Sequence, residues 1–365
     1  MSFNPDNPRR KALIAMSGGV DSSVAAYLAI ESGLDCIGVT MKLFNNEDAG
    51  ISREKSCCSL EDTEYARGVA YRLGMPYYVF NFTADFKEQV MRRFVEAYER
   101  GATPNPCIDC NRYLKFDRLY RRAKELGCEY VVTGHYARIE EGNGRFLLKK
   151  AVDPTKDQSY VLYSMTQDEL RHTLFPLGGM TKTHTRELAR KLGFYNADKP
   201  DSQDICFVPD GDYARFMEDF TGKHYPAGDF LDENGKKVGT HNGAVRYTIG
   251  QRKGLGLAMG APVYVCAKDM QANTVTVGPE ENLFDRIVYA DEVNWIAIPE
   301  LTAPLRVTAR TRYHQTEQAA TVYPAGEGQF RLEFDQPQRA PTPGQAVVLY
   351  QGDVVLGGGT IVAVE

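Results

Sequence analysis

The chain has 365 residues, of which 43% are hydrophobic and 25% are charged, and its formal net charge is −5. This length allows two or three domains, and the composition is that of a soluble globular protein. No apolar run is long enough to cross a membrane, and the first residues lack the apolar core of a signal peptide, so a cytoplasmic protein without membrane attachment is expected. Eight cysteines in such a chain argue against a disulfide framework. The net charge gives no global sign of nucleic-acid binding.

The first half of the chain alternates between predicted strands and predicted helices. Four apolar runs have the length and composition of strands, and they span 10–16, 35–44, 77–82 and 130–139. Amphipathic stretches with the spacing of helices lie between and after them, at 21–33, 59–75, 83–101, 111–126 and 181–194. Strands joined by helices predict a doubly wound parallel sheet, which binds ligands beyond the carboxyl ends of its strands.

The second half of the chain differs from the first in its composition and in the period of its hydrophobic residues. Residues from about 210 to 279 are rich in glycine and turns, which predicts a small mixed domain. After residue 280, short runs such as QAATVYP and QFRLEFD show the period of two that is typical of an antiparallel barrel. We therefore predict an α/β chain with a parallel-sheet domain at 1–209, a central domain at 210–279 and a C-terminal β-barrel at 280–365.

The stretch MSGGVDSSV at 16–24 joins the first predicted strand to the following helix. Gly18 and Gly19 allow backbone N–H groups to turn toward a ligand, and Ser17 and Ser22 add hydroxyl donors. The helix N-terminus adds the positive end of its dipole, so the loop is suited to hold an anion. A tight turn that merely caps a helix is the plainer interpretation. However, SGGVDS resembles the pyrophosphate loop of the ATP pyrophosphatases, and no Walker-type motif occurs.

A second stretch, PNPCIDCN at 104–111, places Cys107 and Cys110 at C-x-x-C spacing. Three interpretations are open here: half of a metal site, a redox disulfide, or one catalytic thiol beside a bystander. The predicted helix after it is basic, either as a solvated face or as a local contact for nucleic acid. Cys110 precedes the expected helix start at Asn111 or Arg112. A thiol at a helix N-terminus near arginines is expected to have a lowered pKa.

A series of motifs, in order along the chain, resembles the tRNA-specific 2-thiouridylase family, which thiolates C2 of the wobble uridine 34 in tRNA. They are GGVDSSV at 18–24, TPNPxxxCN at 103–111, TGHYAR at 133–138, KDQSYVLY at 156–163, DSQDICF at 201–207, GQRKGLG at 250–256, TRYHQ at 311–315 and the terminal LGGGTI. The match runs nearly end to end. It implies a tRNA-uridine 2-sulfurtransferase with an ATP-pyrophosphatase domain, a small central domain and a C-terminal β-barrel that helps to hold tRNA.

The resemblance also implies roles for individual residues. It gives Cys110 the role of nucleophile and Cys206 that of persulfide carrier. It implies that ATP, with Mg²⁺, binds at Ala15, Met16, Ser17, Gly18, Gly19, Val20, Asp21, Ser22, Met41 and Gly134. It implies that Asn105, Pro106 and Cys107 face the target base. Further contacts with tRNA are implied for His135, Lys156, Asp157, Gln158, Arg312, Tyr313 and Gln345. No resident metal ion is expected.

The implied reaction begins when the uridine C2 oxygen attacks the α-phosphate of ATP and expels pyrophosphate. A persulfide on Cys206, loaded by an external sulfur-donor protein, then supplies sulfur to C2. Cys110 attacks the persulfide and forms a transient disulfide with Cys206. AMP leaves, and a reductant restores both thiols.

Alternatives stay open. Another enzyme with this phosphate loop, such as a 4-thiouridine or lysidine synthase, would modify a different base. A non-catalytic tRNA-binding protein with a relic loop would release no pyrophosphate. Cys107, Cys110 and Cys206 together form a possible iron–sulfur site, whereas zinc would need four ligands. Many family members carry Asp at the position of Cys107, so no general acid–base residue is assigned, and Cys57 and Cys58 receive no role.

Overall fold

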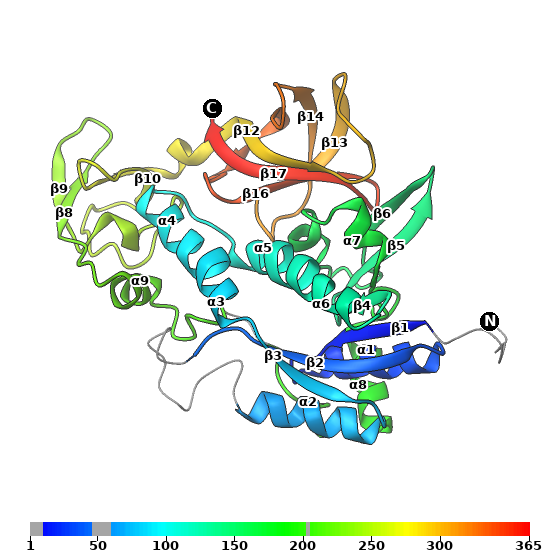
Figure 1. Ribbon diagram of the computed structural model, residues 1–365. Coiled ribbons are helices and arrows are strands. Elements are labelled where there is room, and N and C mark those ends of the chain that lie inside the picture. The colour runs from blue at the N-terminus through cyan, green and yellow to red at the C-terminus, as the bar shows by residue number, and fades with distance from the viewer. Residues whose placement is uncertain (1–9, 46–59, 202–204) are drawn as a thin grey trace. The chain divides into compact units, whose positions relative to one another are not determined.

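The computed structural model describes residues 10–45, 60–201 and 205–365, so that Cys57, Cys58 and residues 202–204 of the DSQDICF motif lie outside the described residues. The chain divides into two compact units (Figure 1). The first unit comprises Met1–Val90, Cys107–Pro209 and Asp353–Val355. The second unit comprises Met91–Pro106, Asp210–Gly352 and Leu356–Glu365. The predicted division into 1–209, 210–279 and 280–365 stays a prediction.

The first unit is built on a five-stranded sheet of order β3-β2-β1-β4-β7. Its strands are β1 (Lys11–Ala15), β2 (Asp35–Lys42), β3 (Tyr77–Asn81), β4 (Tyr130–Val132) and β7 (Thr173–Leu174). All neighbours pair in parallel, which confirms the predicted parallel sheet. The chain order reverses at β1, with β2 on one side and β4 on the other. Doubly wound sheets bind ligands at such a switch point.

Helices connect these strands, as their amphipathic patterns predict. The first unit contains α1 (Val20–Glu31), α2 (Leu60–Arg72), α3 (Thr83–Phe86), α6 (Leu119–Glu125), α7 (Gln167–Arg171), α8 (Lys182–Lys191) and the 3₁₀ turn η4 (Ser159–Leu162). α3 continues into the π-helical segment η2 (Lys87–Arg92) and α4 (Arg93–Glu99). α1 packs on β1, β2 and α8, and α2 packs on β2 and β3. α6 packs on β4.

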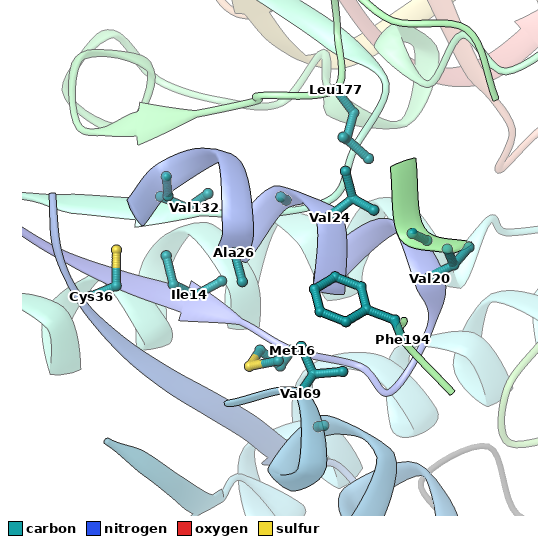
Figure 2. Packing of buried hydrophobic residues seen from close by; sticks show 14 of the residues in the cluster. Ile14, Met16, Val20, Val24, Ala26, Cys36, Val69, Val132, Leu177 and Phe194 are labelled. Atoms are coloured by element: carbon teal, nitrogen blue, oxygen red, sulfur yellow. The ribbon is translucent and has the colours of Figure 1, made fainter. Parts of the chain in front are cut away.

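The core beneath the β1–α1 connection fixes the position of the loop between them (Figure 2). Ile14 and Met16 from the β1 side pack with Val24 of α1, Val69 of α2 and Phe194 after α8, and all five are buried. Burying an aliphatic side chain of this size contributes roughly 1.5–3 kcal/mol. The loop therefore leaves a strand and enters a helix that are both held by packing.

Two predicted boundaries are wrong. The expected strand 130–139 is interrupted, because β4 ends at Val132 and β5 (Ala137–Gly142) instead forms a hairpin with β6 (Arg145–Lys150). The basic helix does not begin at Asn111 or Arg112. It begins at Pro106 with α5 (Pro106–Asp109) and continues through the π-helical segment η3 (Cys110–Arg118) into α6. Proline suits the first helical turn, where its missing N–H is not needed.

The second unit contains a small sheet and a barrel. The small sheet has the order β10-β11-β8-β9 and a core around Phe230, Val265 and Val275. Its strands are β8 (Gly228–Leu231), β9 (Lys237–His241), β10 (Tyr264–Asp269) and β11 (Thr274–Gly278). α9 (Tyr213–Thr221) precedes it, and short 3₁₀ turns lie at η5 (Ala244–Arg246) and η6 (Glu280–Leu283). This confirms the small mixed domain.

The barrel runs β12-β15-β14-β13-β16-β17 and closes because β12 also pairs with β17. Its strands are β12 (Phe284–Trp295), β13 (Leu305–Arg310), β14 (Gln318–Pro324), β15 (Phe330–Arg339), β16 (Ala346–Gln351) and β17 (Val354–Val364). The predicted antiparallel barrel is confirmed. Among the helices that the structure describes, none combines the length and the apolar character needed to span a bilayer.

Candidate active site

The loop between β1 and α1 has a shape that only particular residues permit. Gly18 has a φ of 75°, and a Cβ there would lie 2.4 Å from the carbonyl oxygen of Asp62. The Ser22 hydroxyl donates to the Gly19 carbonyl at 3.0 Å and accepts from the Ser17 N–H at 3.2 Å. The Ser22 hydroxyl, predicted as a ligand donor, therefore shapes the loop itself. α1 begins directly after Gly19 and presents its N-terminal N–H groups.

Gly134 lies against this loop, as predicted for a shared site. A Cβ at Gly134 would stand 2.7 Å from the carbonyl carbon of Asp21 and 2.7 Å from the amide nitrogen of Ser22. The strand β4 ends at Val132, two residues before this close approach to the N-terminus of α1. Met41 lies near the carboxyl end of β2, at the same edge of the parallel sheet. The structure thus brings these predicted nucleotide-binding segments together.

An ionic network, which the sequence analysis missed, surrounds the carboxylate of Asp21. The Lys182 ammonium donates to both oxygens of Asp21, at 2.8 and 2.7 Å. The Tyr136 hydroxyl donates to the same carboxylate at 2.9 Å. The same ammonium lies 2.7 Å from Asp201, so that one cation bridges two carboxylates. A sequence signal existed, since Lys182 is the first residue of α8 and a cation is disfavoured at a helix N-terminus.

Three cations converge on Asp201. Besides Lys182, its carboxylate binds Lys156 at 2.7 Å and Arg186 at 3.1 Å. Burial alone would raise the pKa of Asp201, but the hydrogen bonds and charges of Lys156 and Lys182 outweigh it and lower the pKa to about 2. Asp201 is therefore ionised at neutral pH. With Asp21 the network holds two carboxylates and three cations, which leaves positive charge beside the loop and favours an anionic ligand.

Cys110 lies one turn inside a helix and not at its start. It is partly buried, and burial raises the pKa of its thiol to about 11, although the charge of Lys115 acts in the opposite direction. The expected low pKa is therefore wrong for this structure. In a π-helix the hydrogen bonds run from i to i+5. Cys110 and Lys115 consequently lie about one turn apart, whereas an α-helix would turn them to well-separated faces.

His135 holds Lys115 on this helix. Its Nε2 lies 3.5 Å from the Lys115 ammonium, and its Nδ1 lies 2.7 Å from the Thr133 hydroxyl. Because an ammonium can only donate, Nε2 is the acceptor and Nδ1 carries the proton. Burial and the nearby Lys115 place the pKa of His135 well below its usual value, so the ring is neutral. The buried ring is thus placed to position Lys115.

The segment that carries Cys206 packs on the same unit. Cys206 lies in a turn closed by a bond from the Val208 N–H to the Ile205 carbonyl at 2.8 Å. The next residue, Phe207, is buried edge-on against Phe86 of α3, with ring centroids 5.6 Å apart. α3 in turn packs on η3, and its Asp85 lies 3.1 Å from Arg118 at the end of η3. α3 therefore links the segments of Cys206 and Cys110.

Both cysteines are present as thiols in this structure, and the transient disulfide stays a prediction. Cys107 is exposed, Cys36 and Cys128 are buried, and Cys266 is partly buried. In the part of the chain that the structure describes, no group of three His, Cys, Asp or Glu side chains is placed to hold a metal ion. The three-cysteine cluster stays a hypothesis.

The residues of the 156–158 segment, which are predicted to contact tRNA, differ in their exposure and in their hydrogen-bond partners. Lys156 is partly exposed and binds Asp201, as described above. Asp157 is buried and accepts from the Ser159 hydroxyl at 2.9 Å, which supports the chain turn. The Gln158 side chain accepts from the Tyr136 N–H at 3.0 Å and so supports the segment beside Gly134. Asp157 and Gln158 thus have structural partners in addition to their predicted role.

The other predicted contacts lie in the second unit. Gln345 donates to the Thr103 carbonyl at 2.6 Å, which ties the barrel to the segment containing Asn105 and Pro106. Arg312 is half-buried and donates to the Ala340 carbonyl at 2.7 Å, and Tyr313 follows it in a turn. The second unit therefore contains Asn105, Pro106, Arg312, Tyr313 and Gln345, and Gln345 is bonded to the segment before Asn105.

Comparisons with known proteins cover nearly the whole chain. The model of the tRNA methyl transferase HUP domain matches residues 10–210, that of the tRNA methyl transferase PRC-barrel domain matches 214–279, and that of the aminomethyltransferase beta-barrel domain matches 285–361. The tRNA-specific 2-thiouridylase MnmA of Symbiobacterium thermophilum is 52% identical, over 96% of this chain and 92% of that protein. The protein of the same name from Clostridium acetobutylicum is 49% identical, over 96% and 99% respectively. This chain belongs to the tRNA-specific 2-thiouridylase family.

Proposed function

We propose that this tRNA sulfurtransferase thiolates C2 of the wobble uridine, U34, by ATP-dependent adenylation followed by sulfur transfer from a cysteine persulfide. The observation that carries the proposal is the closure of the phosphate loop by Gly134 at the switch point of the sheet. A loop of that form, with positive charge beside it, suits the anionic phosphates of a nucleotide.

In the adenylation step, ATP binds with Mg²⁺ at the loop from Ala15 to Ser22, with Met41 and Gly134 at the neighbouring strand ends. The close approach of Gly134 leaves room for no side chain there. Asp21 is the carboxylate of this loop, and it would share the metal ion that accompanies the phosphates. The C2 oxygen of uridine attacks the α-phosphate, and pyrophosphate leaves.

In the sulfur-transfer step, a sulfur-donor protein loads Cys206 with a persulfide. Cys110 attacks the inner sulfur, a Cys110–Cys206 disulfide forms, and the released sulfide displaces AMP from C2. An external reductant then restores both thiols. The raised pKa of Cys110 means that the resting enzyme holds a protonated thiol. Because the charge of Lys115 lowers this pKa, Lys115 is the cation that stabilises the Cys110 thiolate during the reaction.

For tRNA, the proposed contacts are Asn105, Pro106, Cys107, Lys156, Asp157, Gln158, Arg312, Tyr313 and Gln345, with His135 acting through Lys115. Of the predicted domains, 1–209 would carry out catalysis, 210–279 would connect the other two domains, and 280–365 would help to bind tRNA. The proposed setting is the cytoplasm, where tRNA, ATP and a persulfide donor are present.

The test uses the purified full chain with ATP, Mg²⁺, unmodified tRNA and either sulfide or a persulfide-loaded donor protein. Mass spectrometry of nuclease fragments of the tRNA should find 2-thiouridine at position 34, and one pyrophosphate should be released with each sulfur incorporated. Sulfur at C4 of another uridine, or modification of a cytidine, would favour the 4-thiouridine or lysidine alternatives. Binding of tRNA without pyrophosphate release would favour the non-catalytic alternative.

A further inference from the structure

Asn196, in the turn that follows α8, contacts the phosphate loop across 178 residues of sequence. Its Nδ2 donates to the Gly18 carbonyl at 2.8 Å and to the Ser23 hydroxyl at 2.9 Å. The Ser23 hydroxyl in turn donates to the Gly19 carbonyl at 3.1 Å. The Asn196 side chain is only 1% exposed. One buried amide therefore holds the carbonyl side of the loop, directly at Gly18 and through Ser23 at Gly19.

The direction of the Gly18 carbonyl sets the direction of the next backbone donor in the loop. The peptide bond between Gly18 and Gly19 is trans and planar, so its C=O and its N–H point in opposite directions. Because the carbonyl is turned toward Asn196, the Gly19 N–H points away from Asn196. No described residue accepts from this N–H. At the start of α1, such an N–H is a donor available to the phosphates of a nucleotide.

The two glycines do not fix this orientation by themselves. A peptide between residues without a Cβ can turn its carbonyl to either side at little steric cost, so it keeps one orientation only when it is held. Asn196 is suited to hold it, because its own backbone is fixed. Its carbonyl accepts from the Lys199 N–H at 3.1 Å, and Phe194, two residues earlier, is buried in the core beneath the loop. The amide is therefore in place before a ligand arrives.

The other end of the Asn196 amide shows that its role extends beyond the stability of the fold. The Oδ1 atom is buried and has no hydrogen-bond partner among the described residues. Leaving a buried acceptor unpaired destabilises a folded protein, and an apolar side chain of similar size would avoid that loss. The asparagine is therefore explained by what its Nδ2 holds, which is the loop.

We propose that Asn196 is a positioning residue for ATP, which orients the Gly18–Gly19 peptide so that the Gly19 N–H donates to the phosphates. This inference rests on the proposed function, since it takes ATP to bind at this loop. Asn196 acts through the backbone and does not itself touch the nucleotide. Its loss should therefore weaken the contacts with the phosphates and leave those with the base and the ribose unchanged.

The test compares the affinity for ATP with the affinity for adenosine, which has the base and the ribose but no phosphate. Equilibrium dialysis of the purified full chain with labelled ligand and Mg²⁺ gives both dissociation constants. Asn196→Leu keeps the approximate size of the side chain and removes its donor. We expect the Kd of ATP to rise about tenfold and the Kd of adenosine to stay within about twofold of the wild-type value.

Asn111→Leu is the matched control. Asn111 is 2% exposed, its Nδ2 donates to the Val161 carbonyl at 2.9 Å, and its Oδ1 is also without a partner among the described residues. The two variants thus remove the same kind of buried amide, but only Asn196 is bonded to the phosphate loop. Asn111→Leu should leave both dissociation constants at their wild-type values, even where its melting temperature falls.

The proposal is overturned if Asn196→Leu leaves both dissociation constants unchanged. It is also overturned if ATP and adenosine lose affinity by the same factor, which is the result of a general structural role. If Asn196→Leu does not fold, the same comparison is made with Asn196→Ala, and an unchanged ratio of the two constants overturns the proposal. A wild-type chain that binds ATP no more tightly than adenosine would instead overturn the proposed phosphate site.

Discussion

The phosphate loop and the helix that carries Cys110 lie in the same unit, yet they differ in what makes them suitable for chemistry. The loop depends on backbone geometry: Gly18 has a positive φ, and Gly134 approaches within a distance that excludes a side chain. The Cys110 helix depends on the environment of one thiol, where burial raises the pKa and Lys115 opposes it. The loop is ready before a ligand arrives, whereas the thiol is held protonated.

This difference indicates a division of labour. A loop that must accept a polyanion benefits from being preorganised, because its donors then need no rearrangement when charge develops. A nucleophilic thiol that is always ionised would react with any oxidant or persulfide it meets. In the proposed mechanism, a Cys110 thiol that stays protonated until tRNA and the adenylated base are in place is protected from such reactions.

The largest effect is expected in the loop. Asp21→Ala removes the carboxylate that binds Lys182 and Tyr136 and that, in the proposed function, lies beside the phosphates of ATP. Pyrophosphate release should fall by about 10²–10³-fold, as for loss of a preorganised electrostatic contact, with the fold retained by circular dichroism. Asp35→Ala, at the exposed amino end of β2, is the control and should keep full activity. Unchanged turnover of a folded Asp21→Ala protein would remove the loop from the chemistry.

A smaller effect is expected on stability. Gly134→Ala would place a methyl group 2.7 Å from the backbone of Asp21, so the first unit should be destabilised by about 2 kcal/mol and ATP binding should weaken. Gly68→Ala is the matched control, because its Cβ meets no atom within 4 Å in α2. That change should stabilise the helix by about 0.5–1 kcal/mol. Urea unfolding with and without ATP measures both, and a neutral Gly134→Ala would show that the two segments do not meet.

Gly134 also shows which features of the fold and the site can be predicted from the sequence and which cannot. The strand–loop–helix pattern and the family motifs predicted the sheet, the barrel and the segments of the phosphate site. They did not reveal that strand 130–139 breaks at Gly134, since only the approach of a distant backbone requires it. Lys182 was missed because its partners lie 161 and 19 residues away in the sequence. The pKa of Cys110 was predicted in the wrong direction, because burial within the fold is not visible in the order of residues.

The thiol itself gives the next prediction. With a pKa of about 11, Cys110 should be alkylated by iodoacetamide at pH 7.5 on the order of a hundredfold more slowly than an ordinary exposed cysteine. The rate should still be rising above pH 10, because deprotonation is incomplete there. Lys115→Gln should shift the profile to higher pH, since the Lys115 charge lowers this pKa. Peptide mapping resolves Cys110 from the other thiols, and a rate that levels off below pH 8 would contradict the account.

The smallest effect is expected from the basic face of the helix. Arg118, Arg121 and Arg122 are exposed but pair with Asp85, Asp117 and Glu125. Replacing all three by Gln should weaken tRNA binding modestly and lower the slope of log K against log salt by about two. Arg67→Gln is the matched control, since Arg67 makes a similar exposed pair with Glu64 on α2. An unchanged slope would assign these arginines to a solvated face.

The most direct test of the account follows adenylation and sulfur transfer separately in three cysteine variants. With a persulfide-loaded donor, Cys206→Ser should form no 2-thiouridine. Cys110→Ser should still release pyrophosphate but should not complete sulfur transfer, because a serine hydroxyl cannot attack a persulfide usefully. Cys107→Ala should keep a good part of the activity. A Cys107→Ala enzyme as inactive as Cys110→Ser, together with iron in the anaerobically purified wild type, would contradict the two-cysteine relay and favour a three-cysteine cluster.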